Sequence, residues 1–290
     1  MAWDTVANIT VGGVLTGLVY SLMALGLSVI FGVIRIVNFA HGEMMAVAMY
    51  AGIFLFLGLG LEPLVSLPLV AAGLFVFGYV LQRTLIDSFV GRPEHEQFIL
   101  LLAVAIILVN GLLILFGPDA RSVMVDYAFD SYLIGPLVID KVKVYAAGAA
   151  MAVSAGLLLF FRYTRVGKAI RACSDNLLGA QVVGLNIRHL YALTFGIGTA
   201  CVAAAGALLI MLIDVTPMIA PEYTLLAFVI VIVGGLGSLA GALLGGVLIG
   251  VSEALAGLLV APSMKTLFSY GLLIVVLLFR PEGLLGKRLT

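Results

Sequence analysis

The sequence predicts an all-α, polytopic inner-membrane protein with eight or nine transmembrane helices, some of them broken or re-entrant. Three observations indicate this fold class: 63% of the 290 residues are hydrophobic, only 10% are charged, and long stretches carry no charge at all. A soluble domain carries about 25% charged residues. Only helices and closed barrels satisfy their backbone hydrogen bonds in lipid, and these stretches lack the alternation of barrel strands.

The apolar stretches predict the positions of the spans. A spanning helix needs about 20 mostly apolar residues. The expected longer spans are Ile9–Ile34, Phe39–Leu61, Leu64–Gln82, Phe98–Phe116, Val144–Phe161, Leu190–Ile213 and Leu239–Val260. Two shorter apolar pieces complete the set, Tyr223–Val233 and Thr266–Phe279. The first stretch follows Asp4 without a basic segment and is too long for the core of a cleaved signal peptide, so we expect it to remain as a helix.

The placement of Lys and Arg predicts the orientation in the membrane. The loop Arg162–Arg188 holds five basic residues and is expected to be cytoplasmic, as is the C-terminal tail with Arg280, Lys287 and Arg288. The loops at 117–143 and 214–222 and the N-terminus are expected outside. An outside N-terminus and a cytoplasmic C-terminus require an odd number of crossings. Nine spans satisfy this parity if Tyr223–Val233 crosses, whereas a re-entrant half-helix there does not.

A polar interruption separates the first two apolar stretches and allows two interpretations. The segment that follows Arg35 contains Asn38, His41, Gly42 and Glu43. It forms either a short cytoplasmic turn or a helix break inside the membrane, where polar groups are costly unless they face a cavity or each other. His41 and Glu43 lie two residues apart and do not face each other on a helix, so no catalytic pair is expected.

A second interruption consists of three glycines and a serine within five residues, namely Gly234, Gly235, Gly237 and Ser238. Such a break is tolerated in a membrane where it lines a water-filled cavity or is buried in protein. We therefore expect either a pathway-lining or gating turn, or a buried one. Further glycines recur four residues apart, which lets two helices approach closely: Gly237, Gly241, Gly245, and then Gly246 and Gly250.

The cytoplasmic loop is expected to contain a short docking helix. Ser174 or Asp175 supplies an N-cap, Leu177–Val183 gives about two turns, and Gly184 ends the helix. A capped helix held just inside the membrane suits contact with a soluble partner. The basic residues around it also suit lipid headgroups.

Motifs of enzymes and of metal or nucleotide sites are missing from the chain. The two cysteines, Cys173 and Cys201, have no metal or disulfide spacing. Ile99 stands where a zinc helix beginning at His95 would need its second histidine, and no P-loop sequence occurs. The 15 basic and 15 acidic residues balance, which argues against nucleic-acid binding. Glu253, inside an apolar stretch, either faces the pathway or is a paired structural carboxylate.

Four segments of the chain carry a family resemblance when they are taken together. They are residues 32–43, the loop 162–188, residues 234–246 and residues 280–286. In their order and spacing they resemble the LivH-type permease subunits of branched-chain amino acid ABC importers, over nearly the whole chain. One departure concerns position 226, where this chain has Leu226 before Ala227 and Phe228 and the family often has lysine.

The resemblance implies one permease domain over residues 1–290, with the coupling loop 162–188 inside it. It implies four kinds of contact: a second related permease subunit, two cytoplasmic ATPase subunits, a periplasmic substrate-binding protein and membrane lipid. ATP would be used by the partner subunits only, with no cofactor or metal on this chain. The implied ATPase-coupling residues are Arg165, Gly167, Arg171, Asp175, Asn176, Ala180 and Gly184. The implied translocation pathway runs along the two interruptions described above.

The solute is left open by this resemblance. Family members carry branched-chain amino acids, urea, short amides or aromatic acids. A stand-alone secondary transporter is the alternative of another class, and it would need ionisable residues in the membrane for ion coupling. Only His41, Glu43 and Glu253 meet that requirement.

Overall fold

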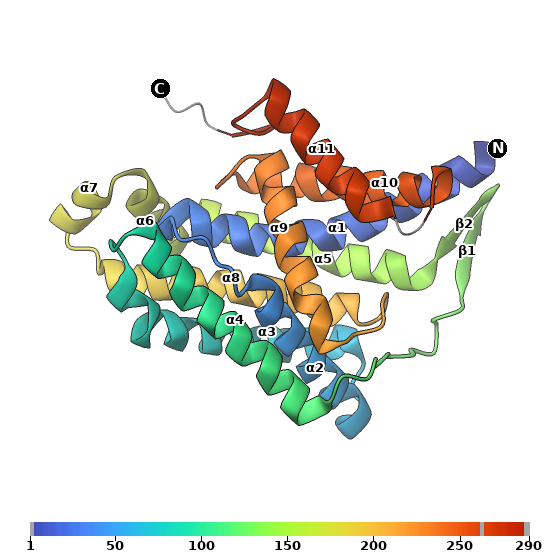
Figure 1. The fold of residues 1–290 in the computed structure, drawn as a ribbon, viewed down its shortest axis with the longest axis horizontal. Helices are drawn as coiled ribbons and strands as arrows, with labels where there is room; N and C mark the ends of the chain where they lie inside the picture. The colour runs from blue at the N-terminus through green and yellow to red at the C-terminus, as the bar shows by residue number, and fades with distance from the viewer. Residues whose placement is uncertain (1–2, 262–263, 287–290) are drawn as a thin grey trace.

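The structure is a computed structural model that describes residues 3–261 and 264–286. Its longer helices are α1 (Trp3–Ile34), α2 (His41–Leu59), α3 (Pro63–Thr84), α4 (Glu94–Phe116), α5 (Lys141–Tyr163), α8 (Ile187–Leu209), α9 (Ala220–Gly234), α10 (Leu239–Leu259) and α11 (Lys265–Phe279). The shorter elements are η1 (Ile86–Phe89), α6 (Arg165–Asp175), α7 (Leu177–Val182), η2 (Pro217–Ile219), β1 (Ser131–Ile134) and β2 (Leu137–Asp140). The helices pack into one bundle (Figure 1). Lys287 and Arg288, two bases of the expected cytoplasmic tail, lie outside the described residues.

The helices confirm a polytopic membrane fold. Within the described residues, eight helical segments are long and apolar enough to cross a membrane, and α11 is a shorter apolar helix of 15 residues. At about 1.5 Å per residue, 15 residues extend about 22 Å, less than a hydrocarbon core of about 30 Å. The shorter apolar piece expected at Tyr223–Val233 is longer in the structure, because η2 and α9 together form the segment Pro217–Gly234, which is long enough to cross.

The loop 117–143 differs from the all-helical expectation because it contains a β-hairpin. β1 and β2 pair antiparallel, with Ser131 opposite Asp140, and Gly135 at φ +61° occupies the turn. The hairpin lies against the start of α1, where Asn8 Oδ1 accepts the Val138 N–H at 2.8 Å. This part of the molecule is called the hairpin end below.

Close glycine contacts hold α1 against α10. A Cβ on Gly17 would lie 2.8 Å from the Gly246 carbonyl oxygen, and one on Gly13 would lie 2.9 Å from that of Gly250. The Ser21 hydroxyl donates to the Leu243 carbonyl at 2.8 Å. The two helices therefore run antiparallel at close range, which confirms the packing role predicted for the glycines at 246 and 250.

The C-terminal end of α1 meets α6 and α7 at the other end of the bundle. The Ser174 hydroxyl at the end of α6 donates to the Gly32 carbonyl at 2.5 Å, and a Cβ on Gly32 would lie 3.3 Å from Gly237 Cα. Figure 1 shows α6 and α7 on the left and the hairpin and N-terminus on the right. The region around α6 and α7 is called the α7 end below.

Candidate translocation and coupling sites

The first interruption is an irregular segment that turns back into the bundle. Arg35, at φ +60°, ends α1, and buried Asn38 accepts the Ala40 N–H at 3.1 Å through Oδ1. The next residue, His41, begins α2, and its Nε2 lies 3.0 Å from the Met23 carbonyl oxygen. Met23 is nine residues before Gly32, about 14 Å along α1 at about 1.5 Å per residue. The geometry thus supports a break inside the bundle rather than a turn at its end.

A threonine of α9 organises the first turn of α2. Thr224 Oγ1 accepts the Gly42 N–H at 2.8 Å and donates to Glu43 Oε2 at 2.9 Å. The first N–H groups of a helix have no partner within it, and a carboxylate is favoured at this positive end. A Cβ on Gly42 would collide with the Ala220 carbonyl oxygen, so glycine permits the close approach. His41 bonds α1 and Glu43 bonds α9, which confirms that the two do not pair.

The second interruption is covered by the C-terminal segment of the chain. Gly234 and Gly235 are buried, and Gly235 adopts φ +109°. The Leu285 N–H donates to the Gly234 carbonyl at 2.9 Å, and a Cβ on Gly235 would lie 2.6 Å from Gly286 Cα. The structure therefore buries the first two glycines of this break in protein, whereas Leu236 and Gly237 are exposed.

The other two residues of the second interruption directly precede α10. Gly237 adopts φ +76°, and Ser238 Oγ accepts the Gly241 N–H at 3.1 Å as the N-cap. The two interruptions stand at opposite ends of α9, because Thr224 and Gly234 are ten residues, about 15 Å, apart along that helix. The structure therefore joins them through α9 and does not bring them side by side.

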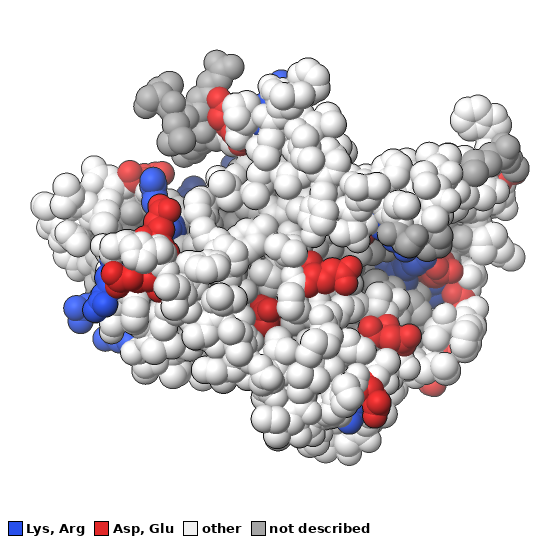
Figure 2. Space-filling model, viewed as in Figure 1, with Lys and Arg blue, Asp and Glu red and all other residues white. Residues whose placement is uncertain are grey.

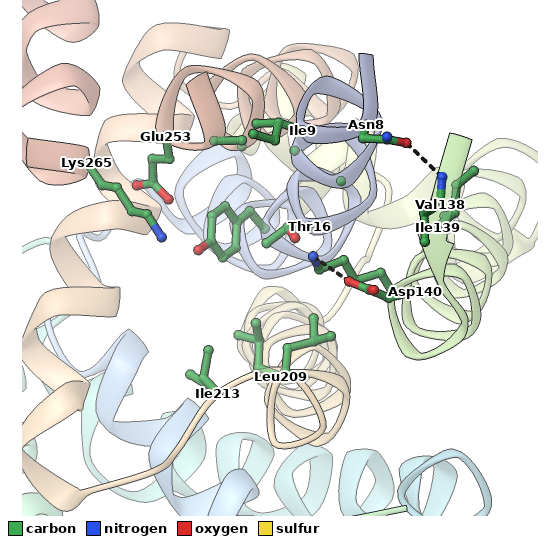
Figure 3. Close-up of a pocket in the computed structure, with 17 residues that line it drawn as sticks. Asn8, Ile9, Thr16, Val138, Ile139, Asp140, Leu209, Ile213, Glu253 and Lys265 are labelled. Carbon is green, nitrogen blue, oxygen red and sulfur yellow. Dashed lines mark hydrogen bonds and ion pairs between the residues drawn. The ribbon is translucent and has the colours of Figure 1, made fainter. Parts of the chain in front are cut away.

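Two cavities near the hairpin end contain residues that the pathway prediction did not include. Their volumes are about 430 Å³ and 390 Å³, and both are lined by Tyr20, Ile213, Glu253 and Lys265. Ser269 donates to Glu253 Oε1 at 2.9 Å, so this carboxylate both faces a cavity and has a partner. One feature of the sequence could have pointed to Lys265, because it is the single Lys or Arg between Arg188 and Arg280. Figure 3 shows Glu253 and Lys265 beside this space.

Helix α7 is capped by a residue other than the predicted ones. The predicted cap of α7, Ser174 or Asp175, is wrong, because α6 continues through both residues. Asn176 is the cap instead, and its Oδ1 accepts the Gly179 N–H at 2.8 Å. Gly184, at φ +81°, follows the helix as predicted, and the Leu185 N–H reaches the Ala180 carbonyl at 3.1 Å.

The coupling residues implied by the resemblance divide into exposed and buried groups. Exposed ones are Arg165, Arg171, Asp175, Asn176 and Gly184, and buried ones are Gly167 and Ala180. A Cβ on Gly167 would lie 2.6 Å from Phe161 Cα, so this glycine seats α6 on α5. The outer surface of α7 and the residue after it is apolar: Leu178 is 74% exposed, Val182 87% and Val183 74%.

Comparison with known proteins finds relatives along nearly the whole chain. A protein-family model described as branched-chain amino acid transport system / permease component matches residues 9–277. The high-affinity branched-chain amino acid transport system permease protein BraD of Pseudomonas aeruginosa is 33% identical over 290 residues, covering 96% of this chain and 94% of that protein. The corresponding LivH permease of Salmonella typhimurium is 31% identical over 294 residues, covering 95% and 94%.

A solved structure shares the fold at low sequence identity. PsaBC from Streptococcus pneumoniae in complex with Fab superposes with a TM-score of 0.50 and 16% identity, over 93% of this chain and 91% of that one. At this identity the likeness concerns the arrangement of helices alone.

Proposed function

Because the chain belongs to the branched-chain amino acid transport permease family, we propose that it carries branched-chain amino acids through the bacterial inner membrane. Family membership makes it a multi-pass permease subunit of an ABC importer. In our proposal a second, related permease completes the channel, and a periplasmic binding protein delivers the amino acid. Two ATPase subunits supply the energy, so ATP is bound by those partners and this chain uses no cofactor.

The exposed apolar surface around α7 supports the docking of ATPase subunits. Leu178, Val182 and Val183 form a small aliphatic surface on a short helix that is capped at its N-terminus. Such a surface outside the spanning helices is costly in water unless a partner covers it. The five bases of the loop support a cytoplasmic position by the positive-inside rule. In our proposal the C-terminus is on the same side, which the contact of Leu285 with Gly234 supports.

A continuous set of contacts leads from α7 to both interruptions. Next to α7, the Ser174 hydroxyl of α6 donates a hydrogen bond to the Gly32 carbonyl at the end of α1. Gly32 in turn packs against Gly237 of the second interruption. From there α9 extends to Thr224, which bonds the first turn of α2. We propose that displacement of α7 by the ATPases moves these packed helices as rigid bodies and opens the interruptions to the solute.

The test is purification and reconstitution of the complete complex, with one substitution at each end of the bundle. Leu178→Glu puts a charge on the α7 surface, and Leu133→Glu is the control because Leu133 is 77% exposed on β1 at the hairpin end. We expect Leu178→Glu to reduce the ATPase subunits that copurify by at least about tenfold, since burying an unpaired charge in an interface costs several kcal/mol. Leu133→Glu should retain them.

Two results would contradict the proposal in different ways. Full ATPase retention and wild-type uptake by Leu178→Glu would remove α7 as the docking helix. The second result is a wild-type complex that hydrolyses ATP and takes up urea, a short amide or an aromatic acid instead of leucine, isoleucine or valine. It would show that the proposed substrate is wrong and that the protein is still an ABC importer subunit.

A further inference from the structure

The two cavities near the hairpin end form a joined polar region at the end of the bundle opposite α7. Their walls come from the first half of α1, the hairpin, the end of α8, and the facing parts of α9, α10 and α11. Figure 2 shows acidic and basic side chains together in a hollow on this part of the surface. In the proposed orientation this is the outer side, where an amino acid released by a binding protein arrives first.

One carboxylate and one ammonium group line both cavities. Glu253 lies six residues before the end of α10, about 9 Å at about 1.5 Å per residue, and Lys265 begins α11. Both side chains project toward the same space (Figure 3). No ion pair joins these two described residues, and the Glu253 carboxylate has Ser269, at 2.9 Å from Oε1, and the Tyr20 hydroxyl as hydrogen-bond partners. Both groups therefore keep bonding capacity for a ligand.

The other charged groups of the region differ from this pair. Lys143 and Asp140 line the first cavity but bond each other at 2.8 Å, so they largely neutralise each other. Glu222, in the first turn of α9, lines the second cavity but not the first. Glu253 and Lys265 are thus the opposite charges shared by both cavities that remain available to a dipolar molecule.

Apolar and aromatic side chains form much of the remaining walls, together with the polar Asn8, Thr16, Thr266 and Ser269. Ile213 lines both cavities and Leu226 lines the second. Tyr20 and Tyr223 stand edge to face with ring centroids 6.3 Å apart. A cavity of several hundred Å³ with a few convergent polar groups on apolar walls is the usual form of a small-molecule site.

We infer that this region is an outer binding site for the amino acid, an inference that rests on the proposed transport function. Glu253 accepts hydrogen bonds from the α-ammonium group, and Lys265 donates to the α-carboxylate. Because these two ligand charges are attached to one carbon, they need two opposite protein charges that face one space. The aliphatic side chain of the ligand packs against Ile213 and Leu226.

The experiment measures L-leucine uptake per ATP hydrolysed by the complete complex in proteoliposomes, with its leucine-loaded binding protein. The variants are Glu253→Gln, Lys265→Met and the double charge reversal E253K/K265E. The loss of one charge-assisted hydrogen bond should lower uptake by about tenfold or more, with the subunits still assembled. The double reversal should restore uptake to within about threefold of wild type, because the two charges exchange places.

Two matched controls separate ligand binding from a structural role. Ser269→Ala removes the hydrogen bond to Glu253 and keeps both charges, so it should lower uptake less than Glu253→Gln does. Lys141→Met removes a charge that is paired with Asp130 at 2.7 Å outside both cavities, and it should transport leucine within about twofold of wild type. Glu253→Asp, which keeps the charge, should transport better than Glu253→Gln if Glu253 binds the ammonium group.

Three outcomes decide the matter. Wild-type uptake by both Glu253→Gln and Lys265→Met overturns the site, and so does a loss in Ser269→Ala as large as in Glu253→Gln. Failure of the double reversal to recover, together with equal activity of Glu253→Asp and Glu253→Gln, also overturns it. A wild-type complex that hydrolyses ATP with the loaded binding protein but moves no leucine refutes the proposed function instead.

Discussion

Replacing Asn176 by alanine tests the link between the short α7 helix and transport. The substitution removes the hydrogen bond in which Asn176 Oδ1 accepts the Gly179 N–H at 2.8 Å. Loss of such a cap costs about 1 kcal/mol. α7 has six residues, of which Ala180 alone is buried, and helices this short are marginal by themselves. A cost of about 1 kcal/mol shifts the helix–coil equilibrium by about fivefold.

We therefore expect Asn176→Ala to lower the amount of solute moved per ATP by up to about fivefold, while ATP hydrolysis by the complex continues. The assay measures uptake and phosphate release in the same proteoliposomes. Asn176→Asp keeps an acceptor oxygen and should behave like the wild type. Asn186→Ala is a second control, because it removes a similar cap, to the His189 N–H at 3.1 Å, from the 23-residue α8.

The reasoning is refuted by either of two results. One is an unchanged ratio of transport to hydrolysis in Asn176→Ala, which would mean that the cap does not hold α7 in its working form. The other is an equal loss in Asn186→Ala, which would mean that the effect is a general response to losing a cap at this end of the molecule.

Two further predictions concern packing and a buried thiol. Gly42→Ala should lower the melting temperature of the purified complex, because the new Cβ would lie 2.6 Å from the Thr224 nitrogen and overpacking costs about 1–3 kcal/mol. Gly58→Ala is the control, because the space around its Cβ is open, and it should leave the melting temperature unchanged. Equal melting temperatures for the two variants would contradict the tight contact at Gly42. Burial raises the pKa of the Cys173 thiol in the folded protein. The neutral thiol therefore contributes its full share to the free energy of unfolding below the unfolded-state pKa of about 8.5, and this share is lost as the pH rises from there through the folded-state pKa. In a Cys201→Ala variant, maleimide should label Cys173 at least about tenfold more slowly than in SDS, and equal rates would exclude its burial.

The positions of the spanning helices could be predicted because each depends on local residues. The expected span Phe98–Phe116 lies within α4 and ends at the same residue, where Gly117 at φ +79° follows. The hairpin was missed because β1 and β2 have four residues each and lie largely exposed, so they carry little hydrophobic signal. The cap of α7 was misplaced by one or two residues because α6 continues through Asp175.

The candidate sites were predictable only in part. The polar residues of the first interruption stood out against their apolar surroundings, but their partner Thr224 lies about 180 residues away in sequence and looks ordinary there. Lys265 was not predicted as a site residue, although it is the single Lys or Arg between Arg188 and Arg280. Its position beside Glu253 depends on how α11 packs against α10, which no local pattern specifies.

The sequence by itself determined where the long apolar helices lie and that the glycines at 246 and 250 allow helices to touch. In lipid every backbone group must be satisfied within its own segment, so these properties are local. Only the tertiary structure decided that α2 begins deep in the bundle against Met23, and that Glu253 and Lys265 face one space. Those arrangements arise from contacts between helices far apart in the chain, whose packing depends on all of their neighbours at once.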